Sequence, residues 1–396
     1  MMAAGRAAER GRRVLLLERG PTPGRKLLLT GNGRCNITNS APLAEFLQAF
    51  GRQGDFLRPA LAALSNTALR EWLRMQGVET VEERKGRVFP ATQDARTVLT
   101  ALLRYLEAGG VKLACGQRVQ ALVLTAGRVA GVRIAERDYA AHRVLVATGG
   151  LSYPATGSTG DGYALARQAG HRIVPTFPAI VALETRETWP AELQGTPIKN
   201  VAISARAGDR CLAETFGEAL WTHYGISGPA IYDISRVVVQ ALHQAREEVV
   251  LELDLRPTDS EAALDERLLY AVKKSGKQQI KTVLAQWLPE RVARILLRLA
   301  EIPPTKRMNQ CSKSDRRRIV RMVKWLTLHV ARPRPIEEAI VTGGGVACDE
   351  VDAHTLESRL VPGLHFAGEV LDIDGPTGGF NLQAAFSTGY LVGESI

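Results

Sequence analysis

The chain has 396 residues, of which 45% are hydrophobic, with a net charge of +10 and five cysteines. It is long enough for two or three domains with their own cores. The cysteines form no CxxC pair, so neither a zinc site nor a disulfide framework is indicated. No apolar run reaches membrane-spanning length and no removable leader is evident, so we expect a cytoplasmic protein without membrane contact. The basic excess is interpreted as diffuse, and nucleic-acid binding is therefore not expected.

The N-terminal stretch predicts a helix followed by a buried strand. Residues 1–11 are rich in Ala and Arg, and 13–18 is an apolar run that ends in an acid. In a dinucleotide-binding fold, the acid after the second strand holds ribose hydroxyls, which is the role we expect for Glu18. A first strand with its GxGxxG turn does not precede this helix. We therefore expect either a start assigned too far downstream or a truncated form that binds a dinucleotide poorly.

Near the other end, a glycine-rich loop joins a short strand to a helix. Residues 364–367 are apolar, 375–379 contain three glycines and a proline, and a helix is expected from about Asn381. Glycines allow a ligand to approach the backbone closely, and the first turn of a helix offers free N–H groups. The acids Glu369 and Asp374 suit sugar or ribityl hydroxyls better than phosphate. This loop is predicted to bind a ligand.

Three further segments carry the same character. They read GRKLLLTGNGRCNITN at 24–39, VLVATGGLSYPATGSTGDGYALARQAGH at 144–171 and AIVTGGGV at 339–346. The first lacks the spacing of a P-loop. The second is a buried strand that ends in glycines, which is where ligands bind in parallel sheets. The third predicts that the chain returns to its first domain before the last loop.

Together with FAGEVLDIDGPTGGFNLQAAFSTG at 366–389, these segments resemble the RdsA/BaiN/aminoacetone-oxidase family of FAD-dependent oxidoreductases. The resemblance implies an α/β protein whose three-layer Rossmann-like FAD-binding domain is interrupted by a β-barrel-like and helical insert. It implies hydride transfer between FAD and a small organic substrate, with NAD(P)H as a candidate reductant. The residues expected at the FAD are Glu18, Arg25, Lys26, Thr30, Gly31, Asn32, Cys35, Asn36, Val119, Thr148, Gly149, Gly150, Gly368, Glu369, Asp374, Gly378, Gly379, Asn381 and Leu382.

The insert is marked by a change in composition. We expect the FAD-binding domain at 1–184 and 337–396, and the insert at 185–336, β-rich to about 258 and then helical. Strands are predicted at 196–207, 210–216 and 249–255, with turns at Gly208 and Gly217. His223 and Tyr224 are interpreted as core residues rather than substrate ligands. The basic run at 314–330 is interpreted as a solvated helix face.

Two other functions stay open. One is a tRNA-interacting flavoprotein, and the other is a truncated remnant without catalytic activity. No metal cluster stands out and no residue can be named as the catalytic proton donor. The substrate, the redox partner and the oligomeric state are not determined by the sequence.

Overall fold

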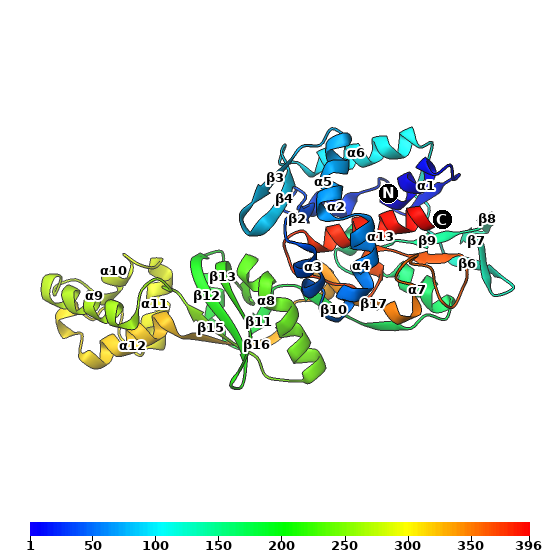
Figure 1. Ribbon diagram of the computed structural model, residues 1–396. Coiled ribbons are helices and arrows are strands. Elements are labelled where there is room, and N and C mark those ends of the chain that lie inside the picture. Colours follow the sequence, from blue (N-terminus) through cyan, green and yellow to red (C-terminus); the bar gives the residue numbers. More distant parts are fainter. The chain divides into compact units, whose positions relative to one another are not determined.

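The computed structural model describes the backbone throughout and the side chains of residues 1–243 and 246–396. Its contacts divide the chain into two compact units, each described by itself here (Figure 1). Unit 1 comprises Met1–Ile180 and Pro335–Ile396, and unit 2 comprises Val181–Arg334. Unit 2 begins before the predicted boundary at 185 because β11 (Leu183–Thr185) is a strand of the barrel in that unit.

Unit 1 contains two pairs of parallel strands. β1 (Leu15–Glu18) pairs with β5 (Lys112–Cys115), and β9 (Val144–Val146) pairs with β18 (Leu364–Phe366). Each pair forms a separate two-stranded sheet. The pairing of β9 with β18 joins segments on the two sides of unit 2 in the sequence, so unit 1 is one domain made of two pieces. Such parallel pairs with helical crossovers are typical of Rossmann-like folds.

Antiparallel strands and helices complete unit 1. β10 (Ile173–Ile180) pairs with β17 (Val341–Val346), and two three-stranded sheets have the orders β2-β4-β3 and β6-β7-β8. Their strands are Thr38–Asn39, Arg87–Pro90, Thr80–Glu83, Ala121–Thr125, Arg128–Ile134 and Arg137–Ala140. The helices are α1 (Met2–Glu9), α2 (Arg25–Leu29), α3 (Leu43–Ala49), α4 (Gly54–Ala63), α5 (Asn66–Met75), α6 (Ala95–Ala108), α7 (Asp161–Gln168) and α13 (Phe380–Ser395).

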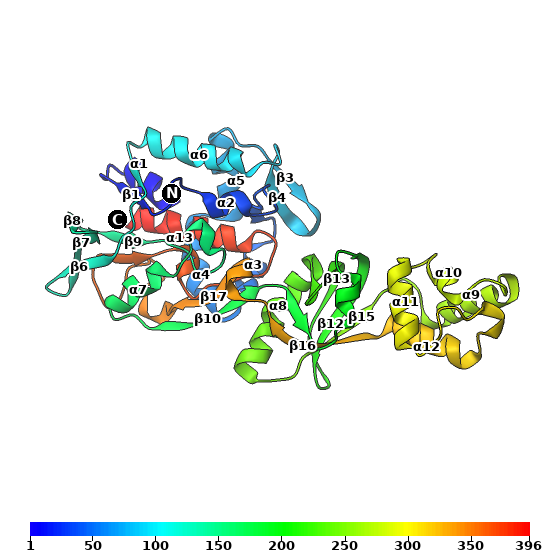
Figure 2. The same ribbon diagram turned by 180° about the vertical axis from the view of Figure 1, so that it is seen from behind.

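The last helix, α13, lies between two hydrophobic cores. Its residue Phe386 packs with the core of α5 and α6, whereas Ala384 and Val392 pack with the core of β9, β17 and β18. A helix covered on both sides is apolar all round, which explains why α13 has no charged residue before Glu394. α1 and α13 lie side by side in both views, and Arg6 forms an ion pair with Glu394 (Figures 1 and 2). The two chain ends therefore meet within unit 1.

Unit 2 contains a closed six-stranded barrel of order β11-β14-β13-β12-β15-β16. β12 (Pro197–Ala207), β13 (Arg210–Thr222) and β15 (Val250–Asp254) are the predicted strands, and β14 (Gly225–Ser227) and β16 (Leu326–Pro333) complete the circle. The helices of this unit are α8 (Pro229–Gln240), α9 (Glu261–Lys274), α10 (Ile280–Leu284), α11 (Glu290–Leu299) and α12 (Lys313–Lys324).

Two expectations for the barrel are wrong. Gly217 is not a turn: it pairs with Val201, and β13 continues to Thr222 because a register shift between Ile198 and Val201 lets the hairpin extend. His223 is not in the core, since it is exposed at the connection between β13 and β14, with its ring 4.8 Å from that of Tyr224. Among the described residues, no helix combines the length and apolar character needed to cross a bilayer.

Candidate functional site

Four segments that are far apart in the sequence meet at the carboxylate of Glu369. Lys26 Nζ of α2 lies 2.6 Å from Glu369 Oε2, and Ser152 Oγ donates to Oε1 at 3.0 Å. The backbone N–H of Thr342 in β17 also donates to Oε1, at 2.7 Å. Lys26 Nζ donates in turn to Ser152 Oγ at 2.7 Å. The glycine-rich segments singled out in the sequence are thus joined by one polar network in unit 1.

This network explains why glycines follow β9. Thr342 Oγ1 accepts from the N–H groups of Leu151 and Ser152, at 2.9 and 3.1 Å. A Cβ on Gly150 would lie 2.4 Å from Thr342 Oγ1, so a side chain there would displace the network. Gly149 has a φ of 73°, which favours glycine. Both glycines are required by protein packing before any ligand is considered.

The two cations of α2 have different surroundings. Lys26 is half-buried and already paired with Glu369, so its ammonium group is committed to holding that carboxylate. The sequence suggested that it neutralises phosphate, but the geometry gives it this structural partner. Arg25 is exposed at the first position of α2. It is the cation of this pair that remains accessible to a ligand.

The loop before α13 is held from two sides. Asn381 Oδ1 accepts from Gly375 N at 2.8 Å, and its Nδ2 donates to Gly375 O at 2.9 Å. Asn39 Nδ2 donates to Gly378 O at 3.0 Å. Gly379 has a φ of 99°, and a Cβ on it would lie 2.2 Å from Thr38 O. Contact with β2 therefore requires Gly379, whereas the sequence analysis attributed this glycine to ligand approach.

The first turn of α13 has no side-chain cap among the described residues. Gly379 occupies the N-cap position and makes no side-chain hydrogen bond to the turn, and no acid lies in that turn. The N–H groups there and the positive end of the helix dipole can interact with negative charge on a ligand. Leu382 in the same turn packs against the core of α5 and α6. Gly368 is tied to the other end of the network, since its N–H donates to Thr388 Oγ1 at 3.0 Å.

The segment after α2 forms a tight turn. Thr30 Oγ1 donates to Leu27 O at 2.7 Å, and Gly31 faces the N–H of Asn36, which a Cβ would approach to 2.9 Å. Asn32 is exposed with a φ of 57°. Cys35 is fully buried, and burial raises the pKa of its thiol to about 12. At neutral pH that thiol stays protonated, which argues against a redox or nucleophilic role.

Glu18 lies at the end of β1, beside the turn after β9. Glu18 Oε1 accepts from Gly20 N at 2.6 Å, and a Cβ on Gly157 would lie 3.8 Å from the same oxygen. The carboxylate of Glu18 also interacts with the amino group of Met1. Burial lowers the pKa of that amino group to about 6, and the negative charge of Glu18 opposes the shift. Val119, just before β6, packs against the core that contains β9. The carboxyl ends of β1 and β9 thus lie at one edge of unit 1.

Residues at this edge fit a dinucleotide. Thr148 is exposed directly after β9, the acid Glu18 ends β1, and α13 presents an uncapped first turn. A hydroxyl-binding acid and an anion-binding helix end are the groups that a dinucleotide-binding fold uses for ribose and phosphate.

An acid that the sequence analysis missed lies in the same loop. Asp372 is buried, and burial raises its pKa, although Arg52 Nη2 and Gln53 Nε2 donate to its carboxylate at 2.9 and 2.7 Å. Asp374, which was expected at the ligand, is also buried and raises the pKa of Asp372 further. The signal was present as two acids in the run LDID, but their burial and the contribution of residues 52–53 are tertiary facts.

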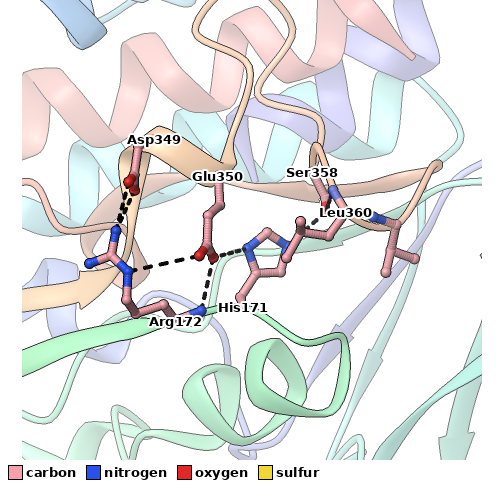
Figure 3. Close-up of polar contacts among 7 residues, drawn as sticks. His171, Arg172, Asp349, Glu350, Ser358 and Leu360 are labelled. Carbon is pink, nitrogen blue, oxygen red and sulfur yellow. Dashed lines mark hydrogen bonds and ion pairs between the residues drawn. The ribbon is translucent and has the colours of Figure 1, made fainter.

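A second polar cluster contains a Ser–His–Glu chain (Figure 3). His171 Nε2 lies 2.7 Å from Ser358 Oγ, and its Nδ1 lies 3.2 Å from Glu350 Oε2. Ser358 Oγ also accepts from the N–H groups of Leu360 and Val361, at 3.1 and 2.9 Å. His171 and Ser358 are both buried, and burial lowers the pKa of His171. This chain ties 350–361 to the end of α7 and is a structural contact, because a nucleophile must be accessible.

Parallel strands that end in an acid and in glycines, followed by a glycine loop and an uncapped helix, are the arrangement of a dinucleotide-binding fold, which in flavoprotein oxidoreductases holds FAD. A family model described as the HI0933-like protein Rossmann domain matches residues 1–395. The chain therefore belongs to the HI0933-like family, and FAD is its cofactor.

Relatives of known activity match along the whole chain. The chain is 33% identical over 382 residues to the 3-dehydro-bile acid delta(4,6)-reductase of Clostridium scindens, covering 96% of this chain and 92% of that protein. It is 30% identical over 403 residues to the ribosomal RNA dihydrouridine synthase of Escherichia coli, covering 100% of this chain and 95% of that protein.

Solved flavoproteins share the fold. The 3-ketosteroid delta1-dehydrogenase of Sterolibacterium denitrificans has a TM-score of 0.54 at 14% identity, covering 99% of this chain and 96% of that one. A quinol-fumarate reductase has a TM-score of 0.50 at 16% identity, covering 99% of this chain and 68% of that one. These two similarities support the fold alone.

Proposed function

We propose that the protein reduces a carbon–carbon double bond conjugated to a carbonyl group. The observation that carries this proposal is that two relatives with different substrates share this chemistry. One is named as a delta(4,6)-reductase of a 3-dehydro bile acid, and the other produces dihydrouridine in ribosomal RNA. In both substrates a double bond lies next to a carbonyl group, so the reaction type is common although the molecules are not.

FAD, when bound and reduced, would supply the hydride that such a reduction needs at the carbon β to the carbonyl, and the α carbon would take a proton. The uncapped first turn of α13 offers N–H donors to negative charge on the ligand, without reorganisation during the reaction. Lys26, Ser152 and Thr342 fix the carboxylate of Glu369, which presents oxygens at a fixed position beside the glycine loop.

NAD(P)H is our candidate for the donor that reduces the flavin, and the cytoplasm, where five free cysteines stay reduced, is the expected compartment. The primary candidate substrate is a small dissolved enone. The second candidate is a uridine of RNA, which the full-length similarity to the dihydrouridine synthase favours. A remnant without activity is the alternative that would bind neither substrate nor FAD.

The test is anaerobic turnover by the purified, FAD-loaded protein. Flavin absorbance is followed as NADH or NADPH is added, and then as a 3-oxo-4-ene steroid or a uridine-containing RNA is added. The expected result is bleaching by one reductant, followed by reoxidation that matches product gaining two hydrogens, measured by mass spectrometry. Stoichiometric FAD that reduces and reoxidises only with oxygen would refute the proposal.

A further inference from the structure

The excess positive charge of the chain is confined to one segment. Residues 256–325 contain 17 Lys and Arg against seven Asp and Glu, a net charge of +10. The other 326 residues contain 34 of each kind and are balanced. The basic excess is therefore concentrated in the helices of unit 2, and the interpretation of a diffuse charge is wrong. Such an asymmetry of charge along a chain favours binding of a polyanion by the charged part.

These helices form a packed cluster whose outer faces are free. Two hydrogen bonds show that α9 and α12 run in opposite directions. Arg316 Nε donates to Asp265 Oδ1 at 2.8 Å, and Trp325 Nε1, further along α12, donates to Glu261 Oε1, earlier in α9, at 2.9 Å. Their inner faces bury apolar side chains such as Leu268. The cluster is drawn in yellow in Figure 1.

Part of the positive charge is used inside the cluster. Lys306 Nζ lies 2.7 Å from Asp315 Oδ2, and Arg318 Nη2 lies 2.9 Å from the other oxygen of that acid. Lys324 Nζ lies 2.5 Å from Asp254 Oδ2. Within residues 256–325, Arg291 donates to the backbone oxygen of Glu192, and seven other exposed cations form no ion pair with a described residue. They are Lys273, Lys274, Lys277, Arg307, Lys313, Arg317 and Arg321.

The seven unpaired cations lie on α9, on α12 and on the segments 276–280 and 306–309, which are hydrogen-bonded to each other. Lys313, Arg317 and Arg321 follow one another at every fourth residue, so they line one side of α12 over about 12 Å. The lysines come from the end of α9 and the turn after it. That turn is bound to 308–309, since Met308 N donates to Gln278 O at 2.9 Å. The end of α9 and the start of α12 are thus neighbours, and both carry exposed cations.

An exposed aromatic residue accompanies these cations. Tyr270 is 63% exposed and lies three and four residues before Lys273 and Lys274, on the same side of α9. Neighbouring like charges repel one another, so an arrangement of this kind costs stability unless a partner neutralises it. A small-molecule substrate cannot contact cations spread over this distance. Cations that track a backbone beside an exposed aromatic ring are the arrangement that binds single-stranded regions of nucleic acid.

We propose that this basic surface of α9 and α12 binds the phosphate backbone of a structured RNA. The cations contact phosphates and Tyr270 stacks on an unpaired base. The choice of RNA rather than another polyanion rests on the uridine candidate proposed above. The contact concerns residues of unit 2, whereas the candidate FAD residues belong to unit 1.

The test measures RNA affinity of the full FAD-loaded protein. A fluorescein-labelled RNA hairpin with a single-stranded loop is titrated at several salt concentrations, and binding is followed by anisotropy. In the triple variant Lys313→Glu/Arg317→Glu/Arg321→Glu, the affinity is expected to fall by tenfold or more. The slope of log affinity against log salt is expected to decrease by about 2–3, because roughly 0.7–0.9 is lost for each phosphate contact.

The matched control is Arg128→Glu/Arg167→Glu/Lys199→Glu, which changes the net charge equally at exposed cations outside the patch. It is expected to retain nearly all of the affinity. Equal weakening in both variants would overturn the proposal, because the charge would then act non-specifically. Tighter binding of the wild type to duplex DNA or to phosphatidylserine vesicles than to the hairpin would also overturn it.

Two readouts keep the result interpretable. Melting temperature and FAD content show whether each variant is folded. If the glutamate variant is not folded, the corresponding glutamine variant is measured instead, and its RNA affinity is expected to fall by a smaller factor. Turnover of a dissolved enone is measured in the same samples and is expected to be unchanged. Loss of RNA binding with intact turnover separates this surface from the redox function, and either proposal can fail alone.

Discussion

Replacement of Gly379 by alanine tests why the loop before α13 contains glycine. The new Cβ would lie 2.2 Å from Thr38 O, a backbone atom that cannot rotate away, and the φ of 99° is unfavourable for alanine. The left-handed conformation costs about 1–2 kcal/mol and the overpacking about 1–3 kcal/mol. The free energy of unfolding should therefore fall by about 2–5 kcal/mol, which lowers the melting temperature of a unit of this size on the order of 10 °C.

The control is Gly378→Ala, and the assay is thermal melting of the FAD-free protein. Gly378 has a similar φ of 109°, but its Cβ would meet nothing closer than Asn39 Nδ2 at 3.4 Å. It should therefore lose only the conformational part. The contrary outcome is that Gly379→Ala melts without FAD at the same temperature as Gly378→Ala and differs from it only in being stabilised less by added FAD. That result would mean that the glycine is needed for the approach of the ligand. The packing explanation would then be refuted.

Three other perturbations test the polar contacts of unit 1. Lys26→Met should lower the free energy of unfolding by about 1–2 kcal/mol because it leaves Glu369 without its cation, and the double change with Glu369→Gln should recover most of that loss in urea titrations. Ser358→Ala should lower the free energy of unfolding by about 1–3 kcal/mol because two backbone N–H groups lose their acceptor. Flavin reduction should continue in this variant. Loss of turnover in a fully stable variant would contradict a structural role for Ser358. Burial lowers the pKa of His171, so below about pH 6.5 the unfolded chain binds more protons and stability should fall as pH drops through that range. His171→Gln should flatten this part of the pH profile, and an unchanged profile would show that other groups cause it.

The fold could be predicted from the sequence to the extent that its signals were local. Strands showed as apolar runs, although β1 is not buried as expected, since Leu15 is 44% exposed and the rest of the strand is half-buried. The return of the chain at 339–346 was also predicted. The extension of β13 past Gly217 could not be predicted, because it depends on pairing with Val201 on another strand.

The candidate site was predicted as a set of segments but not as a set of contacts. Glycine-rich segments indicated where a ligand binds, while the joining of Lys26 to Glu369 across most of the chain is visible only after folding. Asp372 was missed because its burial and its partner Arg52 come from outside the loop. The concentration of charge in 256–325 was in the sequence, but only the helices show which cations are unpaired.

The pairing of β9 with β18 determines the order in which the protein can be completed during synthesis. β9, which begins at Val144, has no partner until Leu364 of β18 is synthesised, and α1 has none until α13 is synthesised. Every strand of the barrel is synthesised between these two stages. On the ribosome, unit 2 can close while the first part of unit 1 still exposes apolar surface that only the last segment covers. A nascent chain stalled before residue 364 should thus be a chaperone client with a folded barrel, and that intermediate is the stage at which aggregation is most probable.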